Sequence, residues 1–402
     1  MTLERHPEFM IQCDWNVCLK ELGCKVWITL KEKDQKGIHG TICRITANEG
    51  QPTATDGFKV LSYLGNSLHV GHESTGRTTI FLPPVKTMSD IHKTSVGAIC
   101  LNASGHAVTA SADGKLIVWD TVTEKLKHDL KGHVGDVYRC RFFPSGEVVL
   151  SSGSDMRLII WCAKTGVKAV TLTGHTMAVT DVGFVDRGRN VISVSKDGTL
   201  KLWNCGDSSC LATVFKHSAG VNCCCLFTPQ GMDLGEPTTP ISDKECGTKG
   251  KAVLIGCEDG QVVCIALHSR KVLFSVTTPS AVNCIADIEN ESFIIGCQDG
   301  SVHLYSLKSP SSPKKSWHSS NSTVHSIVPY KKVGVFSSRA DGNIAFNFLQ
   351  IPNVSLNLTG ADADPVYDLA LSSGLLYSCS RDSTIRVYSP LQLINKIVGK
   401  VD

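Results

Sequence analysis

The sequence lacks the features that would point to a membrane protein, a secreted protein or a nucleic-acid-binding protein. Its 402 residues contain no run of 18 apolar residues, so we expect no membrane span. The opening stretch MTLERHPEFMIQCDW has acids and no apolar run, which argues against a secretory signal. The formal net charge is only +3, so total charge does not predict binding to nucleic acid or membranes. Hydrophobic residues make up 42%, as in a globular protein.

The usual signatures of catalysis are also missing. We find no glycine-rich phosphate-binding loop, no paired Cys-x-x-Cys metal motif and no single-copy nucleophile with its base. We therefore expect no enzyme activity, no cofactor and no metal site.

What is present is an internal repeat. Residues 132–161 read GHVGDVYRCRFFPSGEVVLSSGSDMRLIIW, and related stretches occupy residues 174–203 and 92–119. A turn aspartate recurs at spacings of 42, 42, 62, 40, 42 and 41 residues, and removing one insertion leaves a period near 42. Such a period, with Gly-His and Trp marks, is typical of four-stranded propeller blades. The aspartates are Asp113, Asp155, Asp197, Asp259, Asp299, Asp341 and Asp382.

Two further columns fix the register. A valine stands four residues after each repeat histidine, or at the matching place where the histidine is displaced or absent, and a small apolar residue follows three positions later. These columns indicate the innermost strand of each blade. The valines are Val96, Val137, Val179, Val221, Val282, Val324 and Val366. The apolar residues are Ile99, Cys140, Val182, Cys224, Ile285, Ile327 and Leu369.

Three repeats carry a set of four polar and aromatic residues that can form a hydrogen-bonded chain. A buried carboxylate needs donors, and a buried histidine needs its tautomer fixed. Three copies argue for a structural tetrad and against a hydrolase triad, because an active site is not built three times in one small protein. The sets are His92, Thr109, Asp113 and Trp119; His133, Ser151, Asp155 and Trp161; and His175, Ser193, Asp197 and Trp203. The other units have Ile265, Tyr305, Asn347 and Tyr388 in the tryptophan column, and we expect them to rest more on apolar packing.

We therefore predict an all-β protein, a seven-bladed WD40-type β-propeller over residues 92–402 preceded by a small, mainly β region over residues 1–91. The units lie near residues 92–132, 133–174, 175–216, 217–276, 277–317, 318–360 and 361–402. Residues 78–82 (TTIFL) or 393–398 (LINKIV) could supply the outer strand of the last blade, and the sequence leaves both open. The polar insertion 229–251 in the fourth unit is expected to be a mobile loop, either a tolerated surface loop or a partner loop.

Cysteine is abundant, with 18 copies. A disulfide scaffold or a zinc site is an alternative, but there is no secretory signal, and the clusters Cys205/Cys210 and Cys223–Cys225 lack paired metal spacing. Many cysteines stand instead in columns where sister repeats carry small apolar residues or serine. We expect reduced, structural thiols, and therefore a cytoplasmic and nuclear protein.

Two stretches are more specific than the repeat. FVDRGRNVISVSKDGTLKLWNCG (184–206) and LTGADADPVYDLALSSGLLYSCSRD (358–382) resemble the proteasomal ATPase-associated factor family, and GHVGDVYRCRFFPSGEVVLSSGSD (132–155) is similar too. The resemblance runs along the whole chain, including QCDW (12–15). It implies a non-enzymatic assembly chaperone of the 26S proteasome. Such a protein binds base ATPase subunits of the 19S regulatory particle, chiefly the C-terminal domain of one subunit, and controls assembly or association with the 20S core.

Propellers bind through loops at the mouth of their channel, so the acids predicted there are the candidate partner contacts. The resemblance implies a basic partner surface, which acids would complement. The candidates are Asp362, Asp364, Glu258, Asp136 and Asp181. Lys196 and Arg381 are predicted on the same face, so it is not uniformly acidic.

Two other functions of propellers remain as alternatives. A substrate receptor or scaffold of a ubiquitin ligase often carries Trp-Asp-x-Arg, but WDTV (119–122), WCAK (161–164) and WNCG (203–206) lack the arginine. Binding of RNA or of ribosome-assembly intermediates would need basic loops with interleaved aromatics, and the near-neutral charge does not support it. We expect a monomer that binds neither nucleic acid nor membranes.

Overall fold

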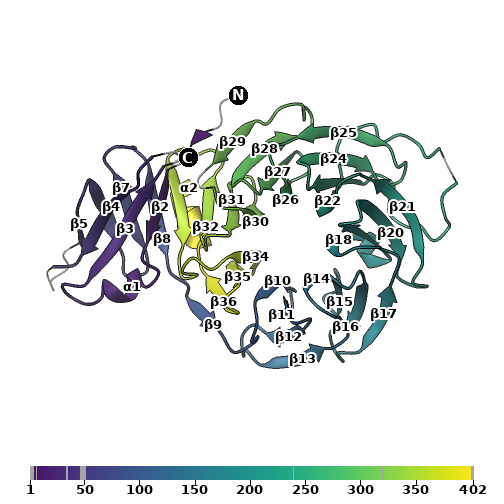
Figure 1. Cartoon of the computed structure of the whole chain (residues 1–402), viewed down its shortest axis with the longest axis horizontal. Helices are drawn as coiled ribbons and strands as arrows, with labels where there is room; N and C mark the ends of the chain where they lie inside the picture. The colour runs from purple at the N-terminus through teal and green to yellow at the C-terminus, as the bar shows by residue number, and fades with distance from the viewer. Residues whose placement is uncertain are drawn as a thin grey trace.

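The computed structural model describes residues 4–5, 7–32, 35–45, 51–238, 240–318 and 321–399. Seven sheets stand in a ring around a central channel, and additional strands lie beside one part of the ring (Figure 1). Each innermost strand contacts that of the next sheet, and the first contacts the last, so the circle is complete. The predicted all-β WD40 propeller is confirmed.

The first four blades each consist of four consecutive antiparallel strands. Blade one holds β10 (Val96–Leu101), β11 (His106–Ser111), β12 (Leu116–Asp120) and β13 (Leu126–Leu130). Blade two holds β14 (Val137–Phe142), β15 (Val148–Gly153), β16 (Leu158–Cys162) and β17 (Lys168–Leu172). Blade three holds β18 (Val179–Val185), β19 (Asn190–Ser195), β20 (Thr199–Asn204) and β21 (Cys210–Lys216). Blade four holds β22 (Val221–Phe227), β23 (Ala252–Cys257), β24 (Gln261–Ala266) and β25 (Val272–Thr277).

The last three blades recruit strands from the N-terminal region. Blade five holds β26 (Val282–Ile288), β27 (Ser292–Cys297), β28 (Ser301–Ser306) and β29 (Lys315–His318), with β1 (Glu4–Arg5) parallel to its edge. Blade six holds β30 (Val324–Tyr330), β31 (Gly334–Arg339), β32 (Ile344–Phe348) and β33 (Val354–Leu358). Blade seven holds β34 (Val366–Ser372), β35 (Leu375–Ser380) and β36 (Ile385–Tyr388), and its outer strand is β9 (Lys86–Met88).

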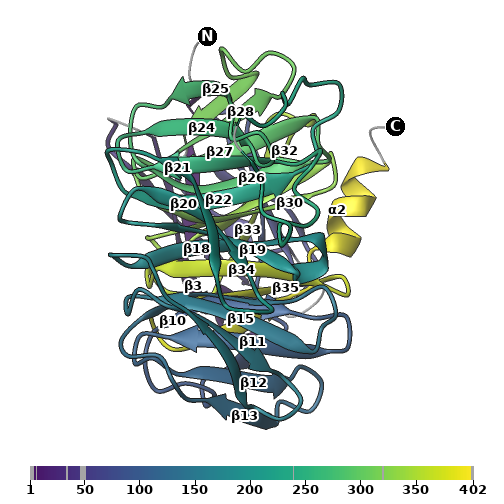
Figure 2. The ribbon, with the colours of Figure 1, turned by 90° about the vertical axis from the view of Figure 1, so that its right-hand side faces the viewer.

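Ring closure differs from both sequence-based alternatives. Residues 86–88 pair with β36, so the outer strand of blade seven precedes residue 92 in the chain. Residues 78–82 form β8 (Thr78–Leu82), which pairs in parallel with β33 of blade six. Residues 393–398 belong to a helix, α2 (Leu391–Val398), whose Ile394 is buried. This helix packs on blade six, where Tyr330 donates a hydrogen bond to Asn395, and lies outside the sheets (Figure 2).

The N-terminal region consists of two small sheets and one helical turn. One sheet holds β2 (Glu8–Ile11), β3 (Lys25–Lys31), β4 (Ile38–Cys43) and β5 (Thr53–Ala54), and α1 (Trp15–Cys18) follows β2. The other holds β6 (Phe58–Tyr63), β7 (Leu68–His72) and β8, which continues into blade six as one seven-stranded sheet. Fully buried Trp15 donates its indole N–H to Thr359 on the propeller. The region is therefore joined to the ring by both backbone pairing and side-chain contacts.

Two of the three predicted tetrads form completely. In blade two, His133 contacts Asp155 through Nδ1 (2.9 Å) and Ser151 through Nε2 (2.7 Å), and Trp161 donates to Ser151 (2.8 Å). Blade three repeats this chain with His175, Asp197, Ser193 and Trp203.

The predicted tetrad of blade one is incomplete. His92 and Trp119 both contact Thr109, but Asp113 accepts from Ser111 and pairs with Lys115 instead of His92. The local Ser111 and Lys115 satisfy that carboxylate, and Nδ1 of His92 has no hydrogen-bond partner among the described residues.

Blades five to seven, which lack the repeat histidine, replace the tetrad with other polar contacts, beyond the apolar packing that we expected. In blade five, His303 bridges Ser301 and Ser316. In blade seven, Arg386 bonds Ser380 and Asp382. In blade six, the fully buried Arg339 donates to the carbonyls of Gly300 and Ser322. A charged or ring side chain therefore substitutes for the missing histidine in each case.

The insertion 229–251 is anchored, contrary to the expectation of a mobile loop. The Glu245 side chain is only 2% exposed and pairs with Arg270, and Thr248 also donates to it. Asn190 exchanges hydrogen bonds with the backbone of Lys244 and Cys246. The loop is thereby fixed to the β18–β19 turn and to the end of β24.

The 18 cysteines are all free thiols. Neither helix in the described part of the chain is long and apolar enough to cross a membrane.

Candidate partner-binding face

One end of the channel is built by a bulge that every blade repeats. Each repeated valine is the first residue of its innermost strand and is almost completely buried. The pairing register shifts directly after it in all seven blades, as a β-bulge requires. A bulge re-aims the extra side chain. The residues after the valines all line the mouth of the channel: Gly97, Tyr138, Thr180, Asn222, Asn283, His325 and Tyr367.

The mouth is a polar, partly aromatic bowl of about 890 Å³. Tyr138 is 38% exposed, and His325 packs edge-on against Tyr367 at 5.2 Å between ring centres. Tyrosine combines a large apolar ring with a hydrogen-bonding hydroxyl, which suits it to protein interfaces. Our sequence reasoning missed these rings, although the position after each repeated valine would have indicated them.

Two of the predicted acids lie at this mouth. Asp136 and Glu258 are exposed and line the bowl. Glu258 pairs with Lys196, which also donates to Asn222. In the described part of the chain no lysine or arginine pairs with Asp136, so that carboxylate is available to an external base.

Asp181 does not lie at the mouth, and its predicted role as a partner contact is wrong. It is the third residue of β18, is only 2% exposed and accepts hydrogen bonds from the backbone N–H of Val182 and Cys224. Arg139 and Arg141 both pair with it. The nearby Asp181 carboxylate raises the pKa of Arg141 above its ordinary value. A carboxylate this deeply buried, with two arginines and two backbone N–H groups around it, is not available to a partner, and removal of one arginine would leave it less compensated.

Arg139 lies between the two cavities of the central channel. Its guanidinium lies 3.4 Å from Asp181 of blade three and 3.4 Å from Asp368 of blade seven. It lines both the mouth and a second cavity of about 630 Å³ at the other end. Asp368 also accepts from Ser326 of blade six and from the backbone N–H of Ile99 of blade one. Together with the Cys224 N–H of blade four, which donates to Asp181, the floor of the mouth is a charge network that joins six blades.

The last two predicted acids lie on the loop between blades six and seven. Asp362 is exposed and borders a groove of about 160 Å³ between this loop and the N-terminal strands β2 and β3. Trp27 of β3, 44% exposed, borders the same groove. Asp364 pairs with Arg381 at 2.9 Å. Within the described residues no base pairs with Asp362, which makes it the more accessible of the two acids.

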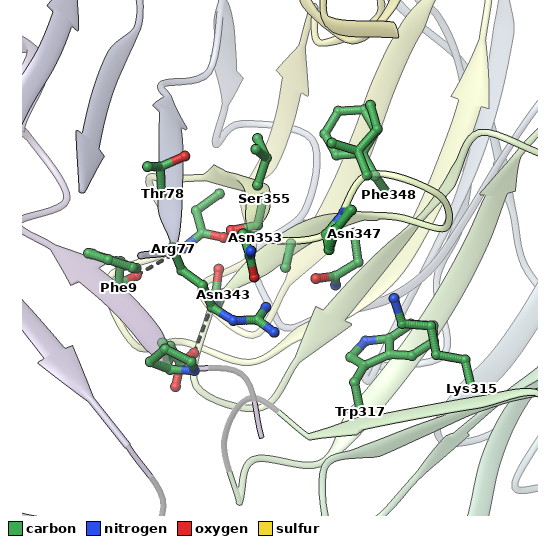
Figure 3. A pocket seen from close by; sticks show the side chains of 17 residues that line it. Phe9, Arg77, Thr78, Lys315, Trp317, Asn343, Asn347, Phe348, Asn353 and Ser355 are labelled. Atoms are coloured by element: carbon green, nitrogen blue, oxygen red, sulfur yellow. Dashed lines mark hydrogen bonds between the residues drawn. The ribbon is translucent and has the colours of Figure 1, made fainter. Parts of the chain in front are cut away.

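A further pocket lies outside blades five and six, where the N-terminal strand β2 contacts the propeller, and we interpret it as part of that contact and not as a binding site (Figure 3). Asn343 donates to Glu8, and Asn357 donates to the carbonyl of Phe9, which fixes β2 against the propeller. Its volume of about 40 Å³ has room for only a few water molecules.

Comparisons with known proteins agree on repeats and on family. The family described as WD domain, G-beta repeat matches residues 83–120, 124–162, 166–204 and 353–389. Proteasomal ATPase-associated factor 1 of Homo sapiens is 39% identical over 383 residues, which are 94% of this chain and 97% of that protein, and the Gallus gallus protein gives the same figures. Probable proteasomal ATPase-associated factor 1 of Dictyostelium discoideum is 35% identical and covers 96% of each chain. With this identity along nearly the full length of both partners, and with repeats that fold as WD40 blades, the chain belongs to the proteasomal ATPase-associated factor family.

Proposed function

We propose that this protein is a non-enzymatic assembly chaperone or regulator of the 26S proteasome. In this proposal it binds base ATPase subunits of the 19S regulatory particle, chiefly the C-terminal domain of one subunit, and controls assembly of the particle or its association with the 20S core. The observation that carries it is the 39% identity over 94% of the chain with a protein named as a proteasomal ATPase-associated factor.

The mouth of the channel supports a binding role. Its bowl, its exposed tyrosine and its acids Asp136 and Glu258 suit a lysine- and arginine-rich helical domain, and the exposed Asp362 on the loop between blades six and seven adds a further acid. Opposite charges steer the approach of a partner and weaken as salt rises. We further propose that the protein acts as a monomer in the cytoplasm and nucleus.

The test is a pull-down of purified ATPase subunits at low and at high salt, with the wild type and a variant that carries Asp136→Lys, Glu258→Lys and Asp362→Lys. We expect the variant to bind at least about tenfold more weakly, because three attractive pairs become repulsive. Glu147→Lys is the matched control: Glu147 is also exposed and also pairs with a lysine, Lys164, but it follows the opposite end of its innermost strand.

A lysate pull-down with mass spectrometry separates the proposal from its alternatives. Free ATPase subunits without 20S subunits are the expected catch. Cullin adaptors would indicate a ubiquitin-ligase receptor, and ribosomal proteins would indicate a role in ribosome assembly. Either result would overturn the proposal.

A further inference from the structure

Blade four lacks the serine and the tryptophan of the tetrad but keeps the histidine and the aspartate. Ile255 and Ile265 occupy the places of the serine and the tryptophan, and both are completely buried. His217 and Asp259 remain in the histidine and aspartate columns. Their role therefore differs from that of the same pair in blades two and three.

The histidine of blade four has turned outward. In blades two and three Nδ1 contacts the aspartate and Nε2 the serine, and the ring is completely buried. In blade four it is Nε2 that contacts Asp259, at 2.8 Å. The side chains of His217 and Asp259 are 13% and 36% exposed, against 0% and 7% for His133 and Asp155. The His217–Asp259 pair is therefore partly exposed to solvent, whereas the same pair in blade two is buried in the core of the blade.

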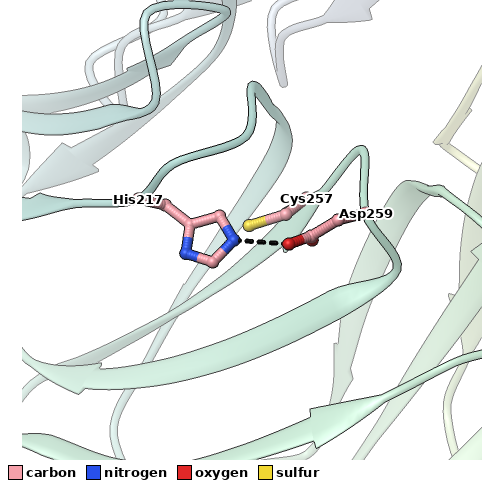
Figure 4. A group of neighbouring side chains, drawn as sticks. All are labelled: His217, Cys257 and Asp259. Carbon is pink, nitrogen blue, oxygen red and sulfur yellow. Dashed lines mark hydrogen bonds and ion pairs between the residues drawn. The ribbon is translucent and has the colours of Figure 1, made fainter.

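A thiol lies beside this pair. Cys257 ends β23, two residues before Asp259, where blades one and three carry Ser111 and Ser195. The Cys257 sulfur, an imidazole nitrogen of His217 and a carboxylate oxygen of Asp259 lie within 4.8 Å of one another (Figure 4). Three different ligand types therefore converge from two segments of the chain.

We propose that His217, Cys257 and Asp259 form a binding site for a zinc-class divalent cation. Zinc accepts nitrogen, sulfur and oxygen ligands at about 2.0–2.3 Å, so that neighbouring ligand atoms in a tetrahedral site lie about 3.2–3.8 Å apart. The ligand atoms lie within 4.8 Å of one another, and His217 Nε2 lies 2.8 Å from Asp259, so the side chains must adjust to bring all three into that range. Water completes the fourth position, because three protein ligands and a solvent-facing side are the pattern of an open zinc site.

The ion competes with a proton on the thiol. A thiol ligates zinc as the thiolate, so zinc binding replaces the proton of Cys257. The bound ion joins the loop before β22 to the β23–β24 turn. Glu258 lies on that turn, between two of the ligands, so the ion also restrains an acid of the channel mouth. The site itself does not depend on the proposed function.

The experiment is a Co²⁺ titration of chelator-stripped, reduced full-length protein, followed by its thiolate-to-metal absorption and by displacement with Zn²⁺. We expect one equivalent of Co²⁺ to give the band in the wild type, and Cys257→Ser to abolish it. Serine fits this column because Ser195 stands there in blade three. His217→Gln should weaken binding by at least about tenfold, since even outer-sphere partners of metal ligands contribute that much.

Cys297→Ser is the matched control. Cys297 stands in the same column of blade five and is equally buried, but in the described chain it belongs to no cluster of three ligands. Zn²⁺ should raise the thermal unfolding midpoint of the wild type and of Cys297→Ser, but not that of Cys257→Ser. Absence of the band, or a band of equal strength in Cys257→Ser, would overturn the proposal. The metal-free unfolding midpoints show whether each variant is folded.

Discussion

At the scale of single residues, one serine connects three elements of blade two. Ser151 contacts the rings of His133 and Trp161, and its replacement by alanine leaves both ring nitrogens buried without that partner. We expect Ser151→Ala to lower the free energy of unfolding by about 2–3 kcal/mol, since each buried unsatisfied polar group costs about 1–3 kcal/mol. Urea denaturation measures this change.

The neighbouring serine is a matched control. Ser152 is equally buried, but its hydroxyl has no hydrogen-bond partner among the described residues. Ser152→Ala should therefore change stability by less than about 0.5 kcal/mol. Equal losses in the two variants would mean that the tetrad contributes nothing beyond side-chain volume.

His92 makes stability depend on pH. Burial lowers its pKa to about 4, with Asp113 opposing and Lys115 adding to the shift. Below about pH 6.5 the histidine is protonated in the unfolded chain but stays neutral in the folded protein. The contribution of neutral, buried His92 to the free energy of unfolding is therefore complete above about pH 6.5 and is lost as the pH falls toward 4. Between about pH 7 and pH 5 the loss is about 2 kcal/mol.

His92→Gln provides the comparison. Urea denaturation gives the free energy of unfolding at pH 7 and at pH 5. The decrease between these two pH values should be about 2 kcal/mol smaller in His92→Gln than in the wild type. Other buried histidines, including His133 and His175, contribute in the same direction and keep part of the loss in the variant. An unchanged pH dependence would contradict the assignment to His92.

The sequence predicted individual site residues only in part. The repeat register was enough to find the innermost strands, and Asp136 and Glu258 lie at the mouth. Asp181 was misplaced because the bulge after Val179 cannot be read from one sequence, and it decides which side chain faces the mouth and which the channel wall. The cluster of His217, Cys257 and Asp259 was missed because its ligands follow no paired metal spacing.

At the scale of elements, Glu245 holds the insertion 229–251 against the propeller. Glu245→Ala removes the partner of Arg270 and the acceptor of Thr248, so the loop should detach from the β18–β19 turn. We expect tryptic cleavage at Lys249 and Lys251 to become about tenfold faster. A tenfold change in rate requires that the free energy of local opening falls by only about 1.4 kcal/mol.

Glu236→Ala is the control in the same loop, since Glu236 is exposed. It should leave the cleavage rate unchanged, and both variants should keep the unfolding midpoint of the wild type within a few degrees. Equal cleavage of Glu245→Ala and the wild type would show that the backbone contacts at Asn190 suffice.

Two elements show where sequence patterns fall short. LINKIV has the β-branched composition of a strand, yet it forms α2, because blade seven already has β9 as its outer strand. TTIFL was predicted as a possible closing strand and is indeed a strand, but its partner is β33 of blade six. Composition predicts a strand, whereas pairing depends on contacts between segments far apart in the chain.

At the scale of the whole molecule, the repeat period predicted the fold and the motifs predicted the family, and both predictions are confirmed. The N-terminal region is not a separate appendage, however, because β8 and β9 enter blades six and seven. The repeat units assigned from the sequence begin at residue 92 and leave β9 out, although the WD-repeat match over residues 83–120 includes it, and residues 78–82 were predicted as a possible strand of the wrong blade.

Truncation tests this interlocking. Residues 92–402 lack both β8 and β9, and we expect this fragment to aggregate or to unfold without a cooperative transition. Residues 83–402 retain β9 but expose the edge of β33, and should fold with a lower unfolding midpoint than the full chain. Circular dichroism during urea denaturation measures both. A 92–402 fragment as stable as the full chain would contradict the role of β9.

The position of β8 and β9 has a consequence for biosynthesis. These strands leave the ribosome before any blade exists, yet their partners β33 and β36 are among the last strands to be translated. Proteins fold progressively from the N-terminus during synthesis. Here β9 must wait without a partner strand, and β8, which can already pair with β7, must wait with its other edge unpaired, until translation is almost complete. A chain that stops early therefore cannot close its ring, and a binding face that all seven blades share arises only on finished molecules.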